Sequence, residues 1–362
     1  MRMQSNQETV LEEFMQRSFG AQFLYIPQKF YKGTAPKEPA DLAWVSNETV
    51  ALFYLQSSRD SLAEQTEHNR NQAAGYHRLW ATKETRYALR GKNRFGDECF
   101  VPYARVRSYL TILVVSNECG VHFAPPITDK IPHAVLVIPD KLLHWIADFG
   151  GTIVDLFTLL NICLTANSSN PSSDPEEQFE DLAATVLAYV THSFANADPE
   201  RRYLSGTPAF DFHILHEHLS RMRMAANNAA LDKDARQQMA DVFGDLMLNE
   251  YASLTATVER AISASSPPEF KNWVVMKMEG KHYSFVVGTV NLQSTNVAQV
   301  TQAVIETSKN EKGGRECISI LYGNIANAND FRVPITIALP KTLPRKHYEI
   351  LSERIIELSR AY

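Results

Sequence analysis

Short apolar runs alternate with amphipathic stretches along the first part of the chain. Apolar residues at helical spacing over residues 8–19 precede two strand-like runs, "ADLAWV" (40–45) and "TVALFYLQ" (49–56). Ser46-Asn47-Glu48 separates these runs, so they predict a β-hairpin. A polar helix over 58–83 follows, and then the strands "YLTILVVSN" (109–117) and "HAVLVIP" (133–139) and the helix "DKLLHWIADF" (140–149).

The last part of the chain repeats this order. A helix over 249–264 precedes two strand-like runs within 272–293, a polar helix over 297–309, the strands "CISILYGN" (317–324) and "VPITIALP" (333–340), and a helix over 345–362. The shared order predicts an internal duplication. Within it, "TILVV" and "SILY" should be buried central strands, because both are continuous apolar runs.

The middle of the chain has a different character. A Ser/Asn/Pro-rich loop begins at residue 167, and mostly helical sequence continues to residue 250. Before it, the apolar run "GGTIVDLFTLLNICLTA" contains Asp155, falls short of a membrane span and predicts a buried core helix. We therefore expect an α/β protein with a first domain over 1–150, a helical spacer over 151–249 and a second domain over 250–362.

Both predicted hairpins end in the same way. The first closes with "LQSS" (55–58) and the second with "LQST" (292–295), each before a polar helix. Alternate residues of a strand point to one face, so the residue at position 54 and Gln56 would reach the same side of the sheet. If the duplication is correct, Gln56 superposes on Gln293.

The element order, with Pro39-Ala40-Asp41 at a strand start, resembles the PD-(D/E)XK nuclease fold. In that family an Asp and a following acid bind Mg²⁺, which activates water, and a Lys two residues further on assists. The resemblance implies a metal-binding role for Asp41, a helical acid at Glu12 or Glu13, and a lysine position at Gln56. It covers about 7–150 and 250–362, where the second-copy equivalents are Glu259, Asn272 and Gln293.

The same positions depart from the family pattern. Tyr54 and Asn291 occupy the second acid position and are neutral, whereas Mg²⁺ prefers carboxylate oxygens. A glutamine supplies no positive charge near a phosphate. Glu64, on the following helix, could act as a migrated acid beside Asp41. Asp41 could equally be a strand-start residue that accepts backbone hydrogen bonds. Because the second acid and the lysine are both missing, we expect an eroded site. If the chain is an enzyme, it is a Mg²⁺-dependent nuclease.

A basic segment lies between the polar helix and the next strand. Cationic residues alternate there with Trp80, Tyr87 and Phe95, which suits contact with a phosphate backbone together with base stacking. The candidate nucleic-acid-binding residues are Arg78, Arg86, Arg90, Lys92, Arg94 and Arg105. A solvated hairpin or a surface for a protein partner would have the same composition.

Composition and the remaining motifs narrow the function classes. The net charge of -5 argues against a wholly basic, nucleic-acid-coating surface. Four widely spaced cysteines and an N-terminus without an apolar signal segment indicate the cytoplasm. His213, His216 and His218 lack a nearby cysteine for a zinc site. The chain contains no P-loop, dinucleotide-binding or nucleophile-elbow motif.

These observations lead to one main hypothesis and two alternatives. The main hypothesis is a nucleic-acid-binding or sensing protein of nuclease ancestry, in DNA processing or defence, whose metal site is eroded. The first alternative is a non-catalytic subunit that docks a partner enzyme. The second is an active metal-dependent nuclease that uses Asp41 and a migrated glutamate. The choice between DNA, RNA and a protein partner stays open, as does the oligomeric state.

Overall fold

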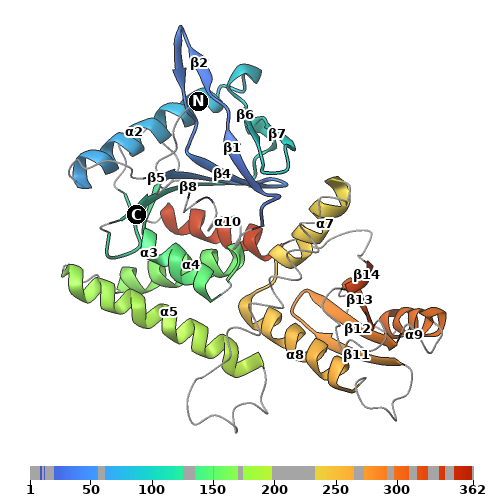
Figure 1. Cartoon of the computed structure of the whole chain (residues 1–362). Helices are drawn as coiled ribbons and strands as arrows, with labels where there is room; N and C mark the ends of the chain where they lie inside the picture. Colours follow the sequence, from blue (N-terminus) through green and yellow to red (C-terminus); the bar gives the residue numbers. More distant parts are fainter. Residues whose placement is uncertain are drawn as a thin grey trace. The chain divides into compact units, whose positions relative to one another are not determined.

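The chain divides into two compact units (Figure 1). The first comprises Met1–Tyr189 with His347–Tyr362, and the second comprises Val190–Lys346. The computed structural model describes residues 9, 12, 20–55, 62–116, 118–124, 135–149, 151–169, 174–197, 233–264, 273–291, 297–309, 316–324, 334–338 and 346–360.

An eight-stranded mixed sheet forms the middle of the first unit, in the spatial order β7-β6-β1-β4-β5-β8-β10-β9. In that order the strands span Glu98–Val101, Leu89–Lys92, Leu24–Pro27, Leu42–Ser46, Thr49–Leu55, Ser108–Val115, Val135–Pro139 and His122–Phe123. β5, β8 and β10 run parallel to one another, and every other neighbouring pair is antiparallel. A separate hairpin of β2 (Phe30–Lys32) and β3 (Ala35–Lys37) is inserted between β1 and β4.

The predicted first hairpin is confirmed as the β4–β5 pair. Its register places Ser46 opposite Thr49, which leaves Asn47 and Glu48 as a two-residue turn. Asn47 has a φ of 54°, a left-handed conformation that asparagine tolerates better than most residues and that tight hairpin turns require. The local sequence therefore fixes the register of the two strands that lead to the candidate site.

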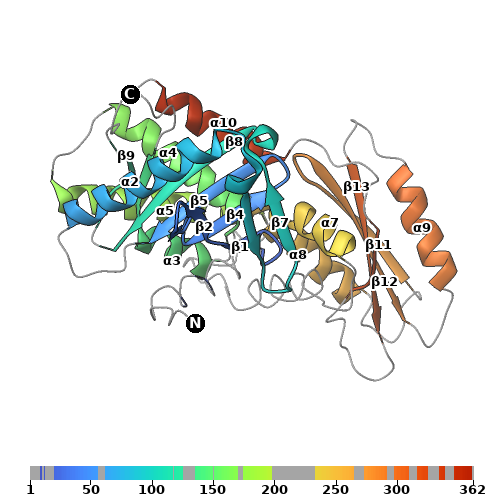
Figure 2. The same cartoon turned by 90° about the horizontal axis from the view of Figure 1, so that it is seen from above.

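Helices cover both faces of this sheet (Figures 1 and 2). On one face α2 (Leu62–Trp80) packs Tyr76 and Trp80 into a cluster with Tyr54 and Leu113. The opposite face carries α3 (Asp140–Asp148), α4 (Ile153–Ser169) and α10 (His347–Ser359), while α5 (Pro175–Ala197) follows α4 in the chain. "TILVV" lies within β8, where every residue is buried, so its prediction as a buried central strand is confirmed.

The predicted core helix is α4, and it is confirmed. Most of its side chains are buried, including Asp155, whose Oδ2 accepts hydrogen bonds from the backbone N–H (2.7 Å) and hydroxyl (3.1 Å) of Thr152. The Tyr189 hydroxyl donates to Asp155 Oδ1. These partners satisfy the carboxylate at the N-terminal end of an apolar helix. None of the helices in the described part of the chain is long and apolar enough to cross a membrane.

The second unit is built on a smaller sheet of order β11-β12-β13-β14. Its strands span Trp273–Glu279, Tyr283–Asn291, Glu316–Asn324 and Pro334–Ala338, and its helices are α7 (Lys233–Gly244), α8 (Leu248–Ala264) and α9 (Val297–Lys309). Val300 and Val304 of α9 pack on Val286 and Leu321 of the sheet. "SILY" lies in β13, between β12 and β14, with Ile320, Leu321 and Tyr322 buried.

The two units share part of their topology. Each has an antiparallel hairpin (β4–β5 or β11–β12), then a helix, and further along the chain a strand parallel to the second hairpin strand. In the first unit β6 and β7 lie between the helix and that strand, whereas in the second unit the strand follows the helix directly. The registers of the two hairpins also agree. In the first, the residue after Asp41 (Leu42) lies opposite the residue three before Gln56 (Phe53). In the second, the residue after Asn272 (Trp273) lies opposite the residue three before Gln293 (Val290). The next strand differs, because β10 is parallel to β8 whereas β14 is antiparallel to β13.

The compact units differ from the predicted domain ranges of 1–150, 151–249 and 250–362. The helix α4 belongs to the first unit, and so does α10, which the repeat had assigned to the second. Packing explains the difference. Tyr348 of α10 makes a T-shaped contact with Trp44 of β4 (ring centroids 4.9 Å apart) and a 2.5 Å hydrogen bond with Ser46. An apolar surface is buried wherever a complementary one exists, irrespective of position in the chain.

This packing makes the C-terminal helix a stabilising part of the first unit. Tyr348→Ala should lower the free energy of unfolding of that unit by about 3–5 kcal/mol, because it removes a fully buried ring. Ile350→Ala is the matched control on the same helix, 42% exposed, and should cost less than about 1 kcal/mol. Urea denaturation followed by circular dichroism measures both. Equal losses for the two variants would show that α10 does not depend on the Tyr348 contact.

Candidate functional site

Asp41 precedes β4 and lies at the end of the β4–β5 pair. Its backbone N–H donates to the Phe53 carbonyl (3.1 Å), and its carboxylate Oδ2 accepts the backbone N–H of Leu55 at 2.8 Å. Leu55 is the last residue of β5, beyond the point where β4 provides a carbonyl partner. A carboxylate that accepts a backbone N–H satisfies a donor that would otherwise be left at the strand end. Asp41 therefore acts as a cap for β5.

Tyr54 occupies the position where the nuclease resemblance places the second acid. Its side chain is fully buried in the cluster beneath α2, and its hydroxyl donates a hydrogen bond to the Pro39 carbonyl. Burial, reinforced by Tyr109, Tyr76 and Asp41, raises the pKa of Tyr54 well above its ordinary value. The hydroxyl stays protonated at any physiological pH, so it is a fixed donor to the backbone and supplies no anionic ligand.

Two other predicted members of the metal site lie in the described part of the chain. Glu12 is a half-buried helical residue, and Glu64 is exposed in the first turn of α2. In the part of the chain that the structure describes, no group of three or more His, Cys, Asp or Glu side chains could hold a metal ion. Within the described residues, Asp41 is engaged with the backbone beside a neutral tyrosine and belongs to no oxygen-rich donor set of the kind that Mg²⁺ prefers.

Several predicted residues lie outside the described part of the chain. These are Gln56, Glu13, Asn272, Gln293 and the histidines His213, His216 and His218. Asn291 is the last residue of β12, and Glu259 lies within α8, although their side chains are not described. The proposed superposition of Gln56 on Gln293 is therefore untested.

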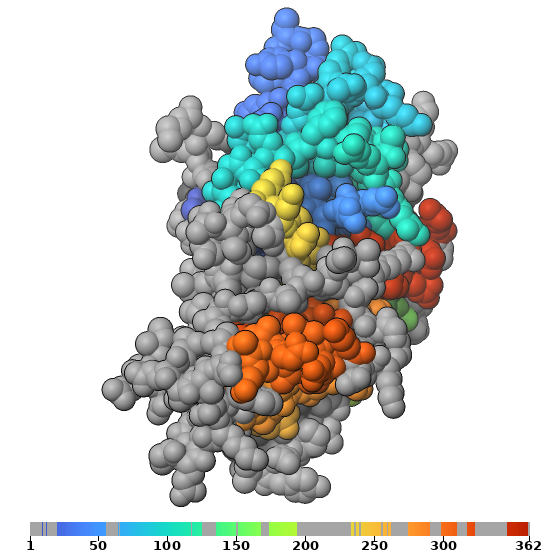
Figure 3. Space-filling model, turned by 90° about the vertical axis from the view of Figure 1, so that its right-hand side faces the viewer, coloured from blue at the N-terminus to red at the C-terminus, as the bar shows by residue number. Residues whose placement is uncertain are grey.

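All six candidate nucleic-acid-binding residues are exposed in the first unit. Arg78 lies in the last turn of α2, and the others follow in the segment between α2 and β8. Arg86 belongs to the short helix η1 (Thr85–Tyr87), Arg90 and Lys92 to β6, Arg94 to the β6–β7 turn, and Arg105 to the short helix η2 (Tyr103–Arg105). Figure 3 shows part of this segment on the surface, in cyan to teal.

Cross-strand pairs organise the exposed face of the β6–β7 hairpin. Arg90 lies opposite Phe100, with its guanidinium carbon 4.9 Å from the ring centroid. Lys92 lies opposite Glu98, with 2.9 Å between Nζ and Oε1. β6 alternates buried and exposed residues, so Arg90 and Lys92 share its outer face. This arrangement produces a cationic strand face with an aromatic ring, 45% exposed, beside it.

Two further arginines lie over aromatic rings at the ends of β6. The guanidinium carbon of Arg86 is 4.7 Å from the Tyr87 centroid, and that of Arg94 is 5.6 Å from the Phe95 centroid. The turn that carries Arg94 is held by Asn93, whose Oδ1 accepts the backbone N–H groups of Phe95 (3.0 Å) and Asp97 (2.9 Å). Such an Asx-type turn limits the freedom of the residue within it.

Two of the three aromatic residues expected to stack on bases have a different role, whereas the third, Phe95, is partly exposed beside Arg94. Trp80 and Tyr87 are buried, and the Trp80 indole N–H donates to the Val101 carbonyl at 3.0 Å, which ties α2 to β7. They support the hairpin from beneath. The exposed ring is Phe100, which sequence reasoning missed. The pattern that predicts its exposure is the alternation of Glu98-Cys99-Phe100 opposite Arg90-Gly91-Lys92. This pattern can be recognised only when the pairing of the two strands is known.

Gly91 allows the hairpin to join the sheet. A Cβ at this position would lie 2.8 Å from the Ile26 carbonyl oxygen and 3.0 Å from the Tyr25 Cβ. The first distance is shorter than a Cβ contact allows and the second is unusually tight, so a larger residue would push β6 away from β1. The outer face of β1 continues that of the hairpin, because Ile26, 48% exposed, lies opposite Lys92.

Comparisons with protein-family models, with curated proteins and with solved structures found no match to this chain.

The capping role of Asp41 leads to a stability prediction. Asp41→Ala should lower the free energy of unfolding by about 1.5–3 kcal/mol, because the Leu55 N–H loses a charged acceptor. Asp41→Asn keeps an oxygen acceptor and should cost less. Urea denaturation in the presence of EDTA compares the two variants with the parent. A melting temperature that millimolar Mg²⁺ raises in the parent, and not in Asp41→Asn, would instead identify Asp41 as a metal ligand.

Proposed function

We propose that this protein binds nucleic acid through the outer face of its β6–β7 hairpin and the flanking short helices. One observation carries the proposal. Arg86, Arg90 and Arg94 each lie over an aromatic ring on an exposed segment, and Arg90 over Phe100 forms the centre of the strand face. The site at Asp41 is proposed to be non-catalytic.

Arginines that lie over aromatic rings suit phosphate recognition. The N–H donors of a guanidinium lie in the plane of the group, so a guanidinium that contacts a ring through its face keeps them for a phosphate. The ring restricts the side chain before any ligand arrives, so less conformational entropy is lost on binding. Guanidinium planes and exposed rings such as Phe100 also stack on unpaired bases, which favours single-stranded regions as ligands.

The ion pairs within this surface do not prevent binding. Arg86 contacts Glu84 (Nε to Oε2, 2.6 Å) and Lys92 contacts Glu98, with all four side chains about half exposed or more. Exposed pairs of this kind are worth roughly 0–1 kcal/mol. A phosphate can therefore replace the carboxylate at little cost. The two glutamates also lower affinity for polyanions in general, which suits a selective binder better than a coating protein.

The non-catalytic assignment follows from the chemistry at the end of β5. Asp41 is engaged with the Leu55 N–H, and Tyr54 is a buried donor to Pro39, so the two positions that a nuclease needs are occupied by structural roles. The resemblance to PD-(D/E)XK nucleases, and the duplication, are part of the proposal as an ancestry. The shared hairpin–helix–strand order of the two units supports it.

The proposed location is the cytoplasm. All four cysteines are free thiols, although Cys99, Cys119 and Cys317 are only partly buried. Free thiols at such positions are typical of a reducing compartment.

A second candidate function is a protein-docking subunit. Ile26 and Phe100, which are 48% and 45% exposed, lie on the same outer sheet face, and exposed apolar side chains that gather on one face mark contact surfaces. In this alternative the arginines would frame a protein interface, and the surface would bind no nucleic acid even at low salt.

The binding proposal predicts the effect of removing two of the arginines that lie over aromatic rings. Arg90→Gln combined with Arg94→Gln should weaken binding of a labelled oligonucleotide by about tenfold or more, because charge-assisted hydrogen bonds to phosphate are lost. The slope of log K against log salt should fall by about one to two, in proportion to the phosphate contacts removed. Fluorescence anisotropy over a salt series, with single- and double-stranded DNA and RNA, measures both quantities.

The control removes the same charge elsewhere in the first unit. Arg354→Gln combined with Arg360→Gln changes two arginines of the C-terminal segment, where Arg354 pairs with Glu357. This variant should leave the affinity nearly unchanged. Equal losses in the two double variants would indicate an effect of net charge alone. Absence of binding by the parent in low salt would contradict the proposal and favour the docking subunit.

The eroded site predicts the absence of nuclease activity. The protein should not cleave single- or double-stranded DNA or RNA with Mg²⁺ or Mn²⁺, and Asp41→Ala should leave nucleic-acid affinity nearly unchanged. Gel assays of the parent and of Asp41→Ala test this. Metal-dependent cleavage that is lost in Asp41→Ala would overturn the non-catalytic assignment, whereas cleavage that survives the mutation would point to a contaminant or to another site.

A further inference from the structure

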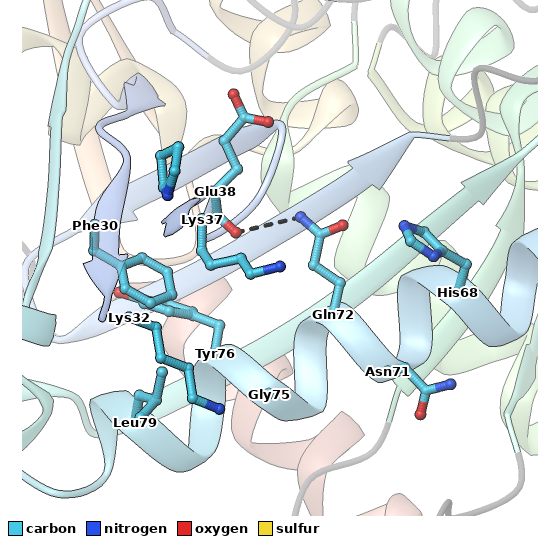
Figure 4. Close-up of a pocket in the computed structure, with 11 residues that line it drawn as sticks. Phe30, Lys32, Lys37, Glu38, His68, Asn71, Gln72, Gly75, Tyr76 and Leu79 are labelled. Carbon is cyan, nitrogen blue, oxygen red and sulfur yellow. Dashed lines mark hydrogen bonds between the residues drawn. The ribbon is translucent and has the colours of Figure 1, made fainter. Parts of the chain in front are cut away.

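A groove separates the β2–β3 hairpin from α2 in the first unit (Figure 4). Its volume is about 390 Å³, within the range of small-ligand sites. One wall is the hairpin, which contributes Phe30, Lys32 and Lys37. The other is α2, which contributes His68, Gln72 and Tyr76 at intervals of four residues, so that they share one helix face.

The charge lining this groove is predominantly positive. Lys32 and Lys37 are exposed, and within the described residues neither forms an ion pair with a carboxylate. The acidic member, Glu38, is paired with Lys29, with 3.4 Å between Nζ and Oε1. Figure 4 shows Lys37 extending from the hairpin toward Gln72 on α2. Two ammonium groups over a concave surface favour an anionic group such as phosphate.

The rest of the lining suits a planar polar group. The Gln72 amide donates to the Glu38 carbonyl at 3.3 Å, which orients the side chain across the groove and leaves its carbonyl oxygen as an acceptor. His68 lies one helical turn away, and Phe30 is a partly exposed ring packed against Tyr76 (5.4 Å between centroids). Amide, imidazole and aromatic groups together offer hydrogen bonds to a base edge and a surface for its face.

Gly75 forms part of the groove and has no packing reason to be a glycine. A Cβ added there would meet nothing within 4 Å, and the residue lies within α2, where glycine costs about 1 kcal/mol relative to alanine. Stability alone would therefore favour a larger residue. The missing side chain keeps the helix surface open beneath the hairpin, which is the property that a ligand-binding groove needs.

We propose that this groove binds a nucleotide, with its phosphate held by Lys32 and Lys37 and its base placed between Phe30 and the Gln72 and His68 side chains. The nucleotide is either a free mononucleotide or one unit of a bound strand. The strand form rests on the proposed nucleic-acid-binding function, whereas the free form stands independently of it.

The test uses the full-length protein and AMP as the probe, with adenosine and inorganic phosphate as partial ligands. Isothermal titration calorimetry should show AMP binding more tightly than either part. Gly75→Leu, which fills the groove, and Lys32→Gln combined with Lys37→Gln should each weaken AMP binding by about tenfold or more. Gly75→Ala is the matched control, and it should raise the melting temperature while leaving AMP affinity nearly unchanged.

A labelled oligothymidylate distinguishes the two sources. If AMP does not bind but Gly75→Leu and the double lysine variant both weaken the oligonucleotide, the groove takes a nucleotide of a strand. If AMP binds equally well to the parent, to Gly75→Leu and to the double lysine variant, the nucleotide binds elsewhere and the inference is wrong. A third outcome is that AMP does not bind and that oligonucleotide binding is weakened by Arg90→Gln/Arg94→Gln but not by Gly75→Leu. This outcome would contradict nucleotide binding in the groove and would leave the proposed nucleic-acid-binding function intact. The lysine variant keeps the test valid if Gly75→Leu does not fold.

Discussion

The burial of β5 and β8 on both faces is the constraint on which the first unit depends. Every residue of these parallel strands is buried, and a sheet that is apolar on both faces needs helices on each side. The crossover from β5 to β8 supplies α2 for one face. The other face is covered by α4 and by α10, whose Tyr348 packs on Trp44 from the far end of the chain. A single physical requirement thus gathers segments that are distant in sequence into one unit.

The same burial accounts for the chemistry at the end of β5. Position 54 faces the layer beneath α2, where Tyr76 and Tyr109 are its neighbours. A carboxylate at this depth would lose its hydration and would need a metal or another cation in compensation. A tyrosine removes that need, because its ring joins the core and its hydroxyl bonds to the Pro39 carbonyl. Asp41 has a structural partner in the Leu55 N–H, which it caps at the end of β5.

The surfaces that we connect with function lie where this burial stops. Trp80 and Tyr87 pack under one face of the β6–β7 hairpin, and the outer face presents Arg90 beside Phe100. The β2–β3 hairpin leaves a groove along α2, where a Cβ added at Gly75 would meet no atom of another part of the chain within 4 Å. Both hairpins are insertions along the chain. The β6–β7 hairpin lies between α2 and β8, and the β2–β3 hairpin lies between β1 and β4. The core strands form the buried sheet, and the two inserted hairpins carry the exposed cationic residues of the proposed binding surfaces.

Several local elements can be predicted from the sequence: the hairpin turning at Asn47, the buried strand "TILVV", the apolar helix with Asp155 and the exposure of the basic residues. Each depends on side-chain periodicity or turn chemistry within a short window. Tertiary structure decided the rest. It assigned the C-terminal helix to the first unit, placed Trp80 inside while Phe100 stayed outside, and turned Asp41 toward the Leu55 N–H. These outcomes depend on which apolar surfaces and strand ends come into contact. The contacts join residues that are distant in sequence, so they are established only when the chain folds.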